Sequence, residues 1–298
     1  MKSNTPSLEF SHFPVMLSEI IQYSKPVKGG TYVDCTFGGG GYSKALLNFP
    51  NTTVIGIDRD KTVSKIAEKL KKNFKERFKF HLLKFSQLDT ILKNNVDTII
   101  FDLGLSSIQL NNLKRGFSFK SKDKLDMTMG LADISAEEVI NNFSEKRLKL
   151  IIKILGEEKE ASKIAKNIIK ERSEKRITRV DELVKIIEKS KKKNFQKKIN
   201  PSTKTFQALR IFVNKEISEL LRGMISAAKI LKKDGILAIV TFHSLEDKIV
   251  KYFFKSLSEN KSVSRYVPKL EQTKTPFRIV KKKPITPSSK ELSENISS

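Results

Sequence analysis

A run of four glycines between a β-prone segment and a helical segment constrains the fold of this chain more than any other feature. Residues 31–37 (TYVDCTF) are apolar and β-rich, and residues 42–49 (YSKALLNF) place Ala45, Leu46 and Phe49 on one helical face. Glycine adopts positive φ values and lets the backbone approach a ligand closely. The pattern therefore predicts a strand, a tight turn and a helix, the arrangement that holds nucleotide-like cofactors.

The alternation of strand and helix patterns continues after this turn. Further strands are predicted at residues 53–58, 78–83, 97–104 and 236–242. Helical spacing of apolar residues occurs at 61–74, at roughly 203–232 and at 247–257. Such alternation indicates βαβ units and a parallel sheet that is covered on both faces.

This pattern is interrupted in the middle of the chain. Strand patterns vanish from about residue 111, and three amphipathic segments follow, with helix-start signals at Ser135 and Thr178. The polar C-terminal residues have too few apolar side chains to predict a packed structure. We predict a discontinuous α/β domain at 8–110 and 200–287, an inserted helical domain at 111–199, and a flexible tail at 288–298.

Acidic residues beside the glycine turn indicate which cofactor it would hold. Asp34 precedes the turn, and Asp58 closes the next predicted strand, where a carboxylate accepts hydrogen bonds from ribose hydroxyls. An acid in the position of Asp34 would repel the diphosphate of a dinucleotide but would suit the cationic S-adenosylmethionine. The sequence therefore favours a methyl donor over NAD, with an ordinary tight turn and a surface acid as the remaining alternative.

The charge balance points to a polyanionic partner. The chain has 58 Lys and Arg residues against 33 Asp and Glu residues, a formal net charge of +25. Such a field attracts nucleic acid, although lysine-rich codon usage would produce the same excess without selection for binding. Lys192 and Lys193 are candidate substrate contacts, together with Lys191, Lys197 and Lys198. The alternative is that this basic run is a solvated loop.

The single cysteine and the short apolar runs limit the setting in which the protein works. Cys35 alone forms no intramolecular disulfide and no cysteine-based zinc site, which suggests a reducing compartment. The longest apolar runs fall short of a bilayer span, and the first ten residues lack the apolar stretch of a signal peptide. We expect a cytoplasmic protein without a membrane partner and without a required metal.

Eight segments, taken in order along the chain, resemble one known family. They are HFPVM (12–16), VDCTFGGGGYS (33–43), GIDRD (56–60), FDLGLSSIQL (101–110), RGFSF (115–119), LDMTM (125–129), INPSTKTFQALRIFVNKEI (199–217) and VTFHSLEDKIVKYFF (240–254). The chain resembles the bacterial 16S ribosomal RNA cytosine-N4 methyltransferases, the RsmH or MraW family. The resemblance implies a class I, Rossmann-like α/β methyltransferase sheet with an inserted helical domain. It also implies S-adenosylmethionine as cofactor and the exocyclic amine of one cytidine in the decoding region of the small ribosomal subunit as substrate.

The resemblance also implies site residues. The cofactor contacts of the family would fall on Gly40, Gly41, Tyr42, Asp58, Phe85, Asp102 and Gln109. An aromatic ring in the position of Phe85 would stack on or flank the adenine. By analogy with other amino methyltransferases, Asp102 or the Leu103 carbonyl would accept a hydrogen bond from N4, and Ser106 would be a further catalytic contact.

Several positions depart from the pattern of the family. The turn has Gly39 and Tyr42 where the family usually has Arg and His, and the later block has Thr128 and Gly130 where it usually has Arg and Asp. The basic ending of the family is also absent. A cofactor contact by Tyr42 would then use its hydroxyl or its backbone.

Two further residues are open to two interpretations. Asn200 and His243 are candidate substrate contacts, but each also lies where a helix is expected to start. For the chain as a whole, the alternatives are a methyltransferase of DNA or transfer RNA, a non-catalytic RNA-binding assembly factor, and, more distantly, an NAD-dependent oxidoreductase.

Overall fold

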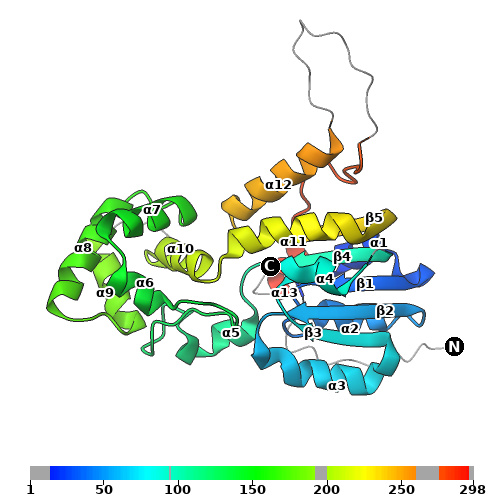
Figure 1. Ribbon diagram of the computed structural model, residues 1–298, viewed down its shortest axis with the longest axis horizontal. Helices are drawn as coiled ribbons and strands as arrows, with labels where there is room; N and C mark the ends of the chain where they lie inside the picture. The colour runs from blue at the N-terminus through cyan, green and yellow to red at the C-terminus, as the bar shows by residue number, and fades with distance from the viewer. Residues whose placement is uncertain (1–13, 94, 192–199, 260–274, 295–298) are drawn as a thin grey trace, which may run out of the picture.

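A five-stranded parallel sheet is the centre of the computed structural model, which describes residues 14–93, 95–191, 200–259 and 275–294 (Figure 1). The strand order is β3-β2-β1-β4-β5. The strands are β1 (Gly30–Asp34), β2 (Thr52–Asp58), β3 (Phe78–Leu82), β4 (Val96–Asp102) and β5 (Leu231–Val240). The first four begin and end within a few residues of the predicted ranges, and the predicted parallel α/β sheet is confirmed.

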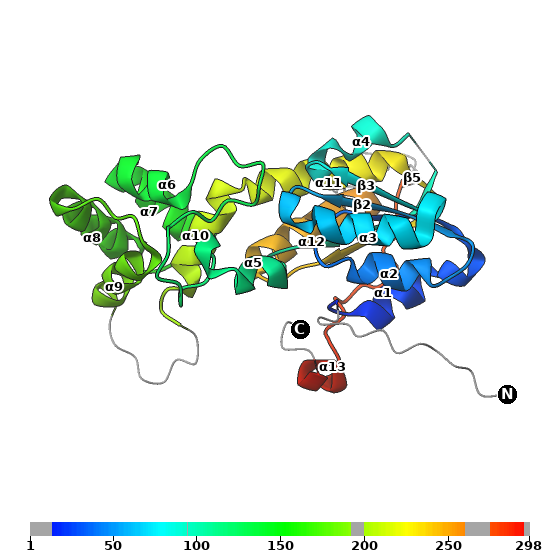
Figure 2. The ribbon, with the colours of Figure 1, turned by 90° about the horizontal axis from the view of Figure 1, so that it is seen from below.

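Helices pack on both faces of the sheet (Figure 2). One face is covered by α1 (Leu17–Ser24), α2 (Gly41–Leu47) and α3 (Ser64–Phe74), and the other by α4 (Leu88–Ile91), α11 (Glu216–Ile230) and α12 (Ser244–Ser258). Each face carries its own cluster of buried apolar side chains. Short 3-10 helices lie at Pro26–Lys28, Lys61–Val63, Lys75–Arg77, Phe85–Gln87 and Leu113–Arg115, and α5 (Ser107–Asn111) follows β4.

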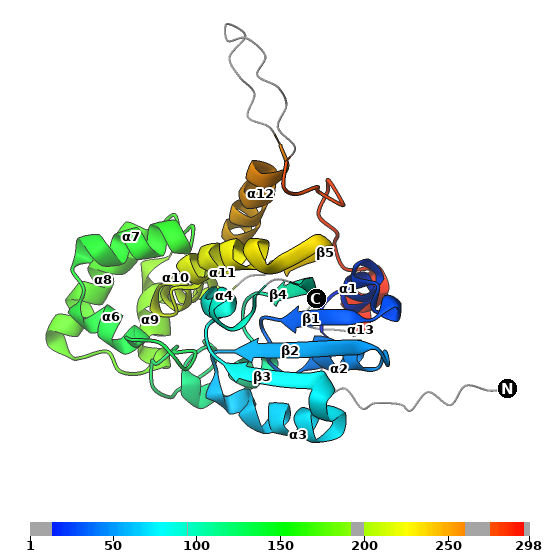
Figure 3. The same ribbon diagram turned by 45° about the vertical axis from the view of Figure 1, so that its right-hand side comes forward.

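A separate helical unit lies beyond the carboxyl ends of the strands (Figure 3). Its helices are α6 (Ala136–Asn142), α7 (Glu145–Leu155), α8 (Ala161–Glu174) and α9 (Val180–Ser190). Ser135 caps α6 as predicted, because its hydroxyl accepts from Glu138 N and the Glu138 carboxylate accepts from Ser135 N. Thr178 does not cap α9. That helix starts two residues later, where Glu182 accepts the amides of Thr178 and Arg179.

The predicted single helix over roughly 203–232 is wrong, because the structure has two. α10 (Thr203–Val213) is followed by its capping residue Asn214, Lys215 adopts a left-handed φ of 53°, and α11 begins at Glu216. Most apolar side chains of α10, among them Phe206 and Leu209, belong to the buried cluster of the helical unit. We therefore propose that the helical unit extends through Val213, beyond the predicted boundary at residue 199.

The C-terminal segment returns to the beginning of the described chain. Residues Ser289–Glu294 form α13, inside the range predicted as a flexible tail, and Glu291 Oε1 accepts from Met16 N at 2.5 Å, next to the start of α1. Within the described parts of the chain, no helix is long and apolar enough to cross a membrane.

Candidate functional site

Three acids end three neighbouring strands of the sheet. Asp34, Asp58 and Asp102 close β1, β2 and β4, whose parallel pairing brings their carboxyl ends to one edge. Ligands of open parallel sheets bind at this edge. The structure thus brings together the acids that the sequence analysis selected from separate motifs.

The glycine turn closes over the acid of the second strand. Gly38 N donates to Asp58 Oδ2 at 2.8 Å, and Asp60 N donates to Asp58 Oδ1 at 2.8 Å. Burial nevertheless raises the pKa of Asp58 to about 6. Gly40 has φ 74°, and a Cβ there would lie 2.9 Å from the Phe37 ring. The turn therefore requires glycine at this position to keep its close packing.

The next two glycines differ in the room around them. A Cβ at Gly41 would lie 2.9 Å from the Pro14 ring, whereas a Cβ at Gly39 would have no neighbour within 4 Å. The turn therefore has room for a side chain at position 39 but not at position 41.

Asp34 is buried with one oxygen unpaired. Its Oδ2 accepts from Ser43 Oγ at 2.7 Å, while its Oδ1 has no hydrogen-bond partner. Burial raises the pKa of Asp34 to about 6, although hydrogen bonds from Ser43 and Thr36 act to lower it. A buried carboxylate oxygen without a partner is costly, and a cationic ligand would relieve that cost.

Asp102 is the most strongly perturbed of the three acids. Its backbone N donates to Thr36 Oγ1 at 2.7 Å, and its Oδ1 is buried without a partner. Burial, followed by the negative charges of Asp34 and Glu246, raises the pKa of Asp102 to about 8. A group with such a pKa holds a proton near neutral pH until a positive charge arrives.

Two aromatic side chains implied as cofactor contacts point into the protein core. The Tyr42 hydroxyl donates to the Val15 carbonyl, and burial raises the pKa of Tyr42. The Phe85 ring packs edge-on against Phe101 at 5.2 Å and lies against Gly223 of α11. The Tyr42 hydroxyl proton is used in the bond to Val15 and the side chain is buried, so the backbone of Tyr42 is the more available group.

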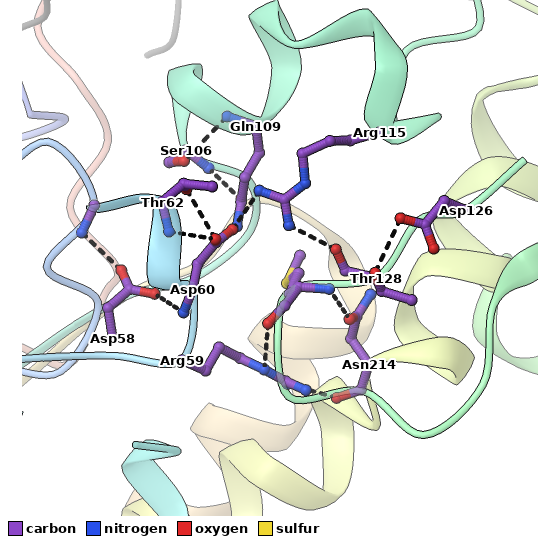
Figure 4. Close-up of polar contacts among 12 residues, drawn as sticks. Asp58, Arg59, Asp60, Thr62, Ser106, Gln109, Arg115, Asp126, Thr128 and Asn214 are labelled. Atoms are coloured by element: carbon purple, nitrogen blue, oxygen red, sulfur yellow. Dashed lines mark hydrogen bonds and ion pairs between the residues drawn. The ribbon is translucent and has the colours of Figure 1, made fainter. Parts of the chain in front are cut away.

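Ser106 and Gln109 hold the loop after β4 in place (Figure 4). Ser106 Oγ accepts from Gln109 N at 3.3 Å at the start of α5, and Gln109 Oε1 accepts from Ser106 N at 3.0 Å. Gln109 Nε2 donates to Asp60 Oδ2 at 2.8 Å. Gln109 thus joins the loop after β4 to the loop after β2, and Ser106 keeps its hydroxyl proton available.

Arg115 extends this network into the segment before the helical unit (Figure 4). It pairs with Asp60, and its Nη2 donates to the Thr128 carbonyl at 2.6 Å. Burial acts to raise the pKa of Asp60, but hydrogen bonds from Gln109, Arg115 and Thr62 outweigh it and hold that pKa below its usual value.

Asn214, at the break between α10 and α11, makes a second connection (Figure 4). Its Nδ2 donates to the Met127 carbonyl, its Oδ1 accepts from Met129 N, and its own carbonyl accepts from Arg59 at 2.8 Å. Gly130, the residue after Met129, has φ 79°, and a Cβ there would lie 2.4 Å from the Arg59 carbonyl. The absence of a side chain at residue 130 therefore allows the close approach of this loop to Arg59.

Sequence reasoning missed the roles of Asp60, Arg115 and Asn214. All three lie in segments that carried the family resemblance, GIDRD, RGFSF and the segment 199–217, but no function was assigned to them. Asp60 is 2% exposed and Asn214 fully buried. The signal that could have found them was a charged or amide side chain within a motif whose other residues are apolar or bind the cofactor.

His243 lies in a largely buried polar group at the start of α12. Its Nδ1 accepts from Glu246 N at 3.3 Å, and its Nε2 lies 3.1 Å from Glu246 Oε1 without a hydrogen bond. Glu216, His243 and Glu246 are close enough to one another to hold a metal ion. Arg210 already pairs with both oxygens of Glu216 at 2.9 Å, so a resident cation balances this group.

The structure describes only some of the other candidate substrate contacts. Asn200 Oδ1 accepts from Ser202 N at 2.8 Å just before α10, a local turn that agrees with its interpretation as a helix start. Lys191 pairs with Glu158 and donates to the Pro201 carbonyl. Lys192 and Lys193, like Lys197 and Lys198, lie outside the described residues.

Comparisons with known proteins agree on one family. The model of the MraW methylase family matches residues 9–298. A protein named Ribosomal RNA small subunit methyltransferase H from Rickettsia massiliae is 44% identical over 291 residues, which cover 96% of this chain and 94% of the relative. A protein of the same name from Ehrlichia ruminantium is 41% identical over 290 residues, 95% of each chain. A solved structure described as a putative rRNA-methylase from Clostridium thermocellum covers 33% of this chain and 55% of its own, at 21% identity and a TM-score of 0.27, an overlap too small to add to these matches.

Proposed function

The chain belongs to the MraW methylase family, and from that premise we propose that it transfers a methyl group from S-adenosylmethionine to the N4 amine of one cytidine in 16S ribosomal RNA. The decoding region of the small subunit is the proposed location of this cytidine, and the cytoplasm is the proposed compartment. The observation that carries the proposal is the group of buried acids at the edge of the sheet. Membership of a methylase family sets aside an NAD-dependent oxidoreductase.

The residues at this edge fit a cationic cofactor. Asp34 Oδ1 and Asp102 Oδ1 are buried acceptors without partners, and a ligand with positive ammonium and sulfonium groups would satisfy both. Asp58 would bind the ribose hydroxyls with the lone pairs that its two amide bonds leave free. Gly40, Gly41 and the backbone of Tyr42 would line the turn, and Phe85 would contribute the part of its surface that the core leaves open.

The reaction needs an acceptor beside the target amine. The lone pair of a cytosine N4 is delocalised into the ring, so an acceptor that holds one N–H helps the nitrogen become a nucleophile. The cofactor would supply a methyl group on a good leaving group, so the proposal requires no metal. Most of the acceleration would come from alignment of the reacting atoms.

Asp102 is the residue we assign to that role. Positive charge in the site would lower its raised pKa, so that its carboxylate would accept a hydrogen bond from N4 and then the proton that N4 loses. The Leu103 carbonyl is the alternative acceptor, and the bond from Leu103 N to the Val240 carbonyl fixes this backbone next to Asp102. Ser106 would donate its free hydroxyl proton to the base, while Gln109 would act by holding this loop.

The RNA would bind across the helical unit and the edge of the sheet. Lys192 and Lys193 would contact phosphates, whereas Lys191 is engaged with Glu158 and would keep the preceding helix in place. Such contacts weaken as salt rises. A Lys192→Ala, Lys193→Ala double variant should therefore bind with a shallower salt dependence than the wild type. Asn200 and His243 are proposed to lie near the substrate at the starts of their helices.

Methyl transfer to small ribosomal subunits tests the whole proposal. The subunits would come from a strain that lacks the corresponding methylation, the cofactor would carry a labelled methyl group, and the RNA would be digested to nucleosides. The expected product is N4-methylated cytidine, and Asp102→Ala should abolish it while the protein stays folded. A different methylated nucleoside, or transfer only to DNA or transfer RNA, would overturn the substrate assignment. Binding of subunits without any transfer would instead indicate an assembly factor.

A further inference from the structure

Phe242 is an exposed aromatic residue at the edge of the sheet where the acids lie. It follows β5, whose last residue Val240 pairs with Asp102, and its side chain is 48% exposed. Its ring lies beside the loop after β4, since a Cβ at Gly104 would be 3.3 Å from Phe242 Cδ2. Gly104 has φ 98°. A glycine in this left-handed conformation therefore lets the ring lie close to the backbone two residues after Asp102.

The backbone that carries this ring is fixed by a buried carboxylate. Phe242 N donates to Glu246 Oε2 at 3.0 Å, and Glu246 is only 3% exposed. The other Glu246 oxygen lies 3.1 Å from His243 Nε2, and the Glu246 amide donates to His243 Nδ1. The first turn of α12 thus holds an exposed ring in one place through the buried carboxylate of Glu246.

The position of Phe242 distinguishes it from the other exposed aromatic residue. Among the described residues, the exposed aromatic side chains are Phe242 and Tyr252. Tyr252 lies on α12 next to an apolar surface groove formed with α11, away from the ends of β1, β2 and β4. Of these two residues, only Phe242 lies beside the loop that follows Asp102.

We propose that the target base stacks on the Phe242 ring, which makes Phe242 a substrate-positioning residue for methyl transfer. An enzyme that modifies a base of folded RNA must unstack that base, and an exposed aromatic face replaces part of the lost stacking. The base on this ring would have its exocyclic amine at the edge of the sheet that Asp102 closes. This inference rests on the proposed function and adds the surface that would hold the substrate.

Kinetics with small ribosomal subunits would test the stacking surface. Loss of one base–aromatic stack corresponds to about a 10- to 100-fold weaker interaction. Phe242→Ala and Phe242→Leu should both lower kcat/KM by at least about tenfold, because leucine keeps apolar bulk but has no aromatic face. Phe242→Trp should retain activity within about twofold, and so should the matched variant Tyr252→Ala, which removes an exposed aromatic ring elsewhere.

Two further measurements separate this role from a structural one. The dissociation constant of S-adenosylmethionine and the melting temperature of each Phe242 variant should match those of the wild type. Full activity of Phe242→Ala or of Phe242→Leu would overturn the inference, and so would an equal loss of cofactor affinity in Phe242→Ala. A wild-type protein that methylates no cytidine would overturn the proposed function itself, and the stacking surface with it.

Discussion

The Gln109 carboxamide donates to the Asp60 carboxylate at 2.8 Å, and this bond joins the loop after β4 to the loop after β2. Gln109 is 6% exposed, and its side-chain oxygen accepts from Ser106 N. Its polar atoms are therefore used to hold two loops that border the proposed cofactor site. A residue that resemblance assigns to cofactor contact thus also determines the shape of that site.

Replacement of Gln109 by Glu should weaken cofactor binding by about tenfold or more. The variant would lose a buried donor and place a second carboxylate opposite Asp60, so the two loops would separate or one acid would take up a proton. Titration calorimetry with S-adenosylmethionine measures the affinity. Gln22→Glu, on an exposed position of α1, is the matched control and should bind as the wild type does. Equal affinities for the two variants would show that the Gln109–Asp60 bond has no part in shaping the site.

Replacement of Asn214 by Asp should disturb both stability and activity. The Asn214 amide donates to the Met127 and Arg210 carbonyls, and a carboxylate in its place would donate to neither. We expect a loss of roughly 2–4 kcal/mol in the free energy of unfolding, because the buried Met127 carbonyl would lose its donor and face a carboxylate, while the Arg210 carbonyl keeps its bond from Asn214 N. Denaturant unfolding measures this loss.

A second asparagine provides the control for that variant. Asn141 donates to the Glu137 and Ile177 carbonyls and accepts from Ile177 N, the same pattern of bonds inside the helical unit. Asn141→Asp should destabilise the protein similarly but leave cofactor affinity unchanged, whereas Asn214→Asp should lower both. If the two variants affect cofactor affinity alike, the connection through Asn214 does not reach the site.

The sheet was predictable because its strands carry local signals. A glycine turn after β1 and an acid at the end of β2 mark the ends of those strands in the sequence itself. The break between α10 and α11 has no such signal, since neither glycine nor proline lies at residues 213–216. It depends on the bonds that Asn214 makes to Met127 and Met129, which are distant in sequence.

The positions of the acids at the site were predictable from the sequence, but the directions of its aromatic side chains were not. Strand ends place Asp58 and Asp102 at one edge in any parallel sheet. The direction of a side chain depends on its partners, and the partner of the Tyr42 hydroxyl is the Val15 carbonyl, in a segment that sequence reasoning left without structure. Phe85 likewise packs against Gly223 of α11, a contact that no local pattern encodes.

Binding of S-adenosylmethionine near neutral pH should release protons. Asp102 has a pKa of about 8 and Asp34 and Asp58 have pKa values of about 6, so at pH 7 Asp102 holds most of a proton that a bound cation would displace. Titration calorimetry in two buffers of different ionisation enthalpy should give a release of about one proton at pH 7 and less at pH 9. Identical enthalpies in both buffers at pH 7 would contradict a raised pKa in the free protein.

The same acid should make the ligand-free protein less stable as pH rises. Asp102 keeps its proton in the folded state up to about pH 8, whereas an unfolded aspartate loses it near pH 4, so the folded state binds more protons in this window. The free energy of unfolding should therefore fall between about pH 4 and pH 8. Asp102→Asn, which resembles the protonated acid and does not titrate, should be more stable than the wild type at pH 8, with a difference that shrinks toward pH 4.

Asp181, a surface acid, should change stability with pH in the opposite direction, and its variant serves as the control for Asp102→Asn. The hydrogen bond from Arg179 lowers the pKa of Asp181, so its carboxylate stabilises the folded state above the ordinary pKa of aspartate and less as pH falls. Asp181→Asn should then be slightly less stable than the wild type at pH 8, because it lacks the charge that pairs with Arg179. Thermal unfolding of the three proteins at pH 5 and pH 8 measures both effects. If the wild type is as stable as Asp102→Asn at pH 8, the Asp102 carboxylate is already charged in the free protein. A cationic cofactor would then bind without displacing a proton from Asp102.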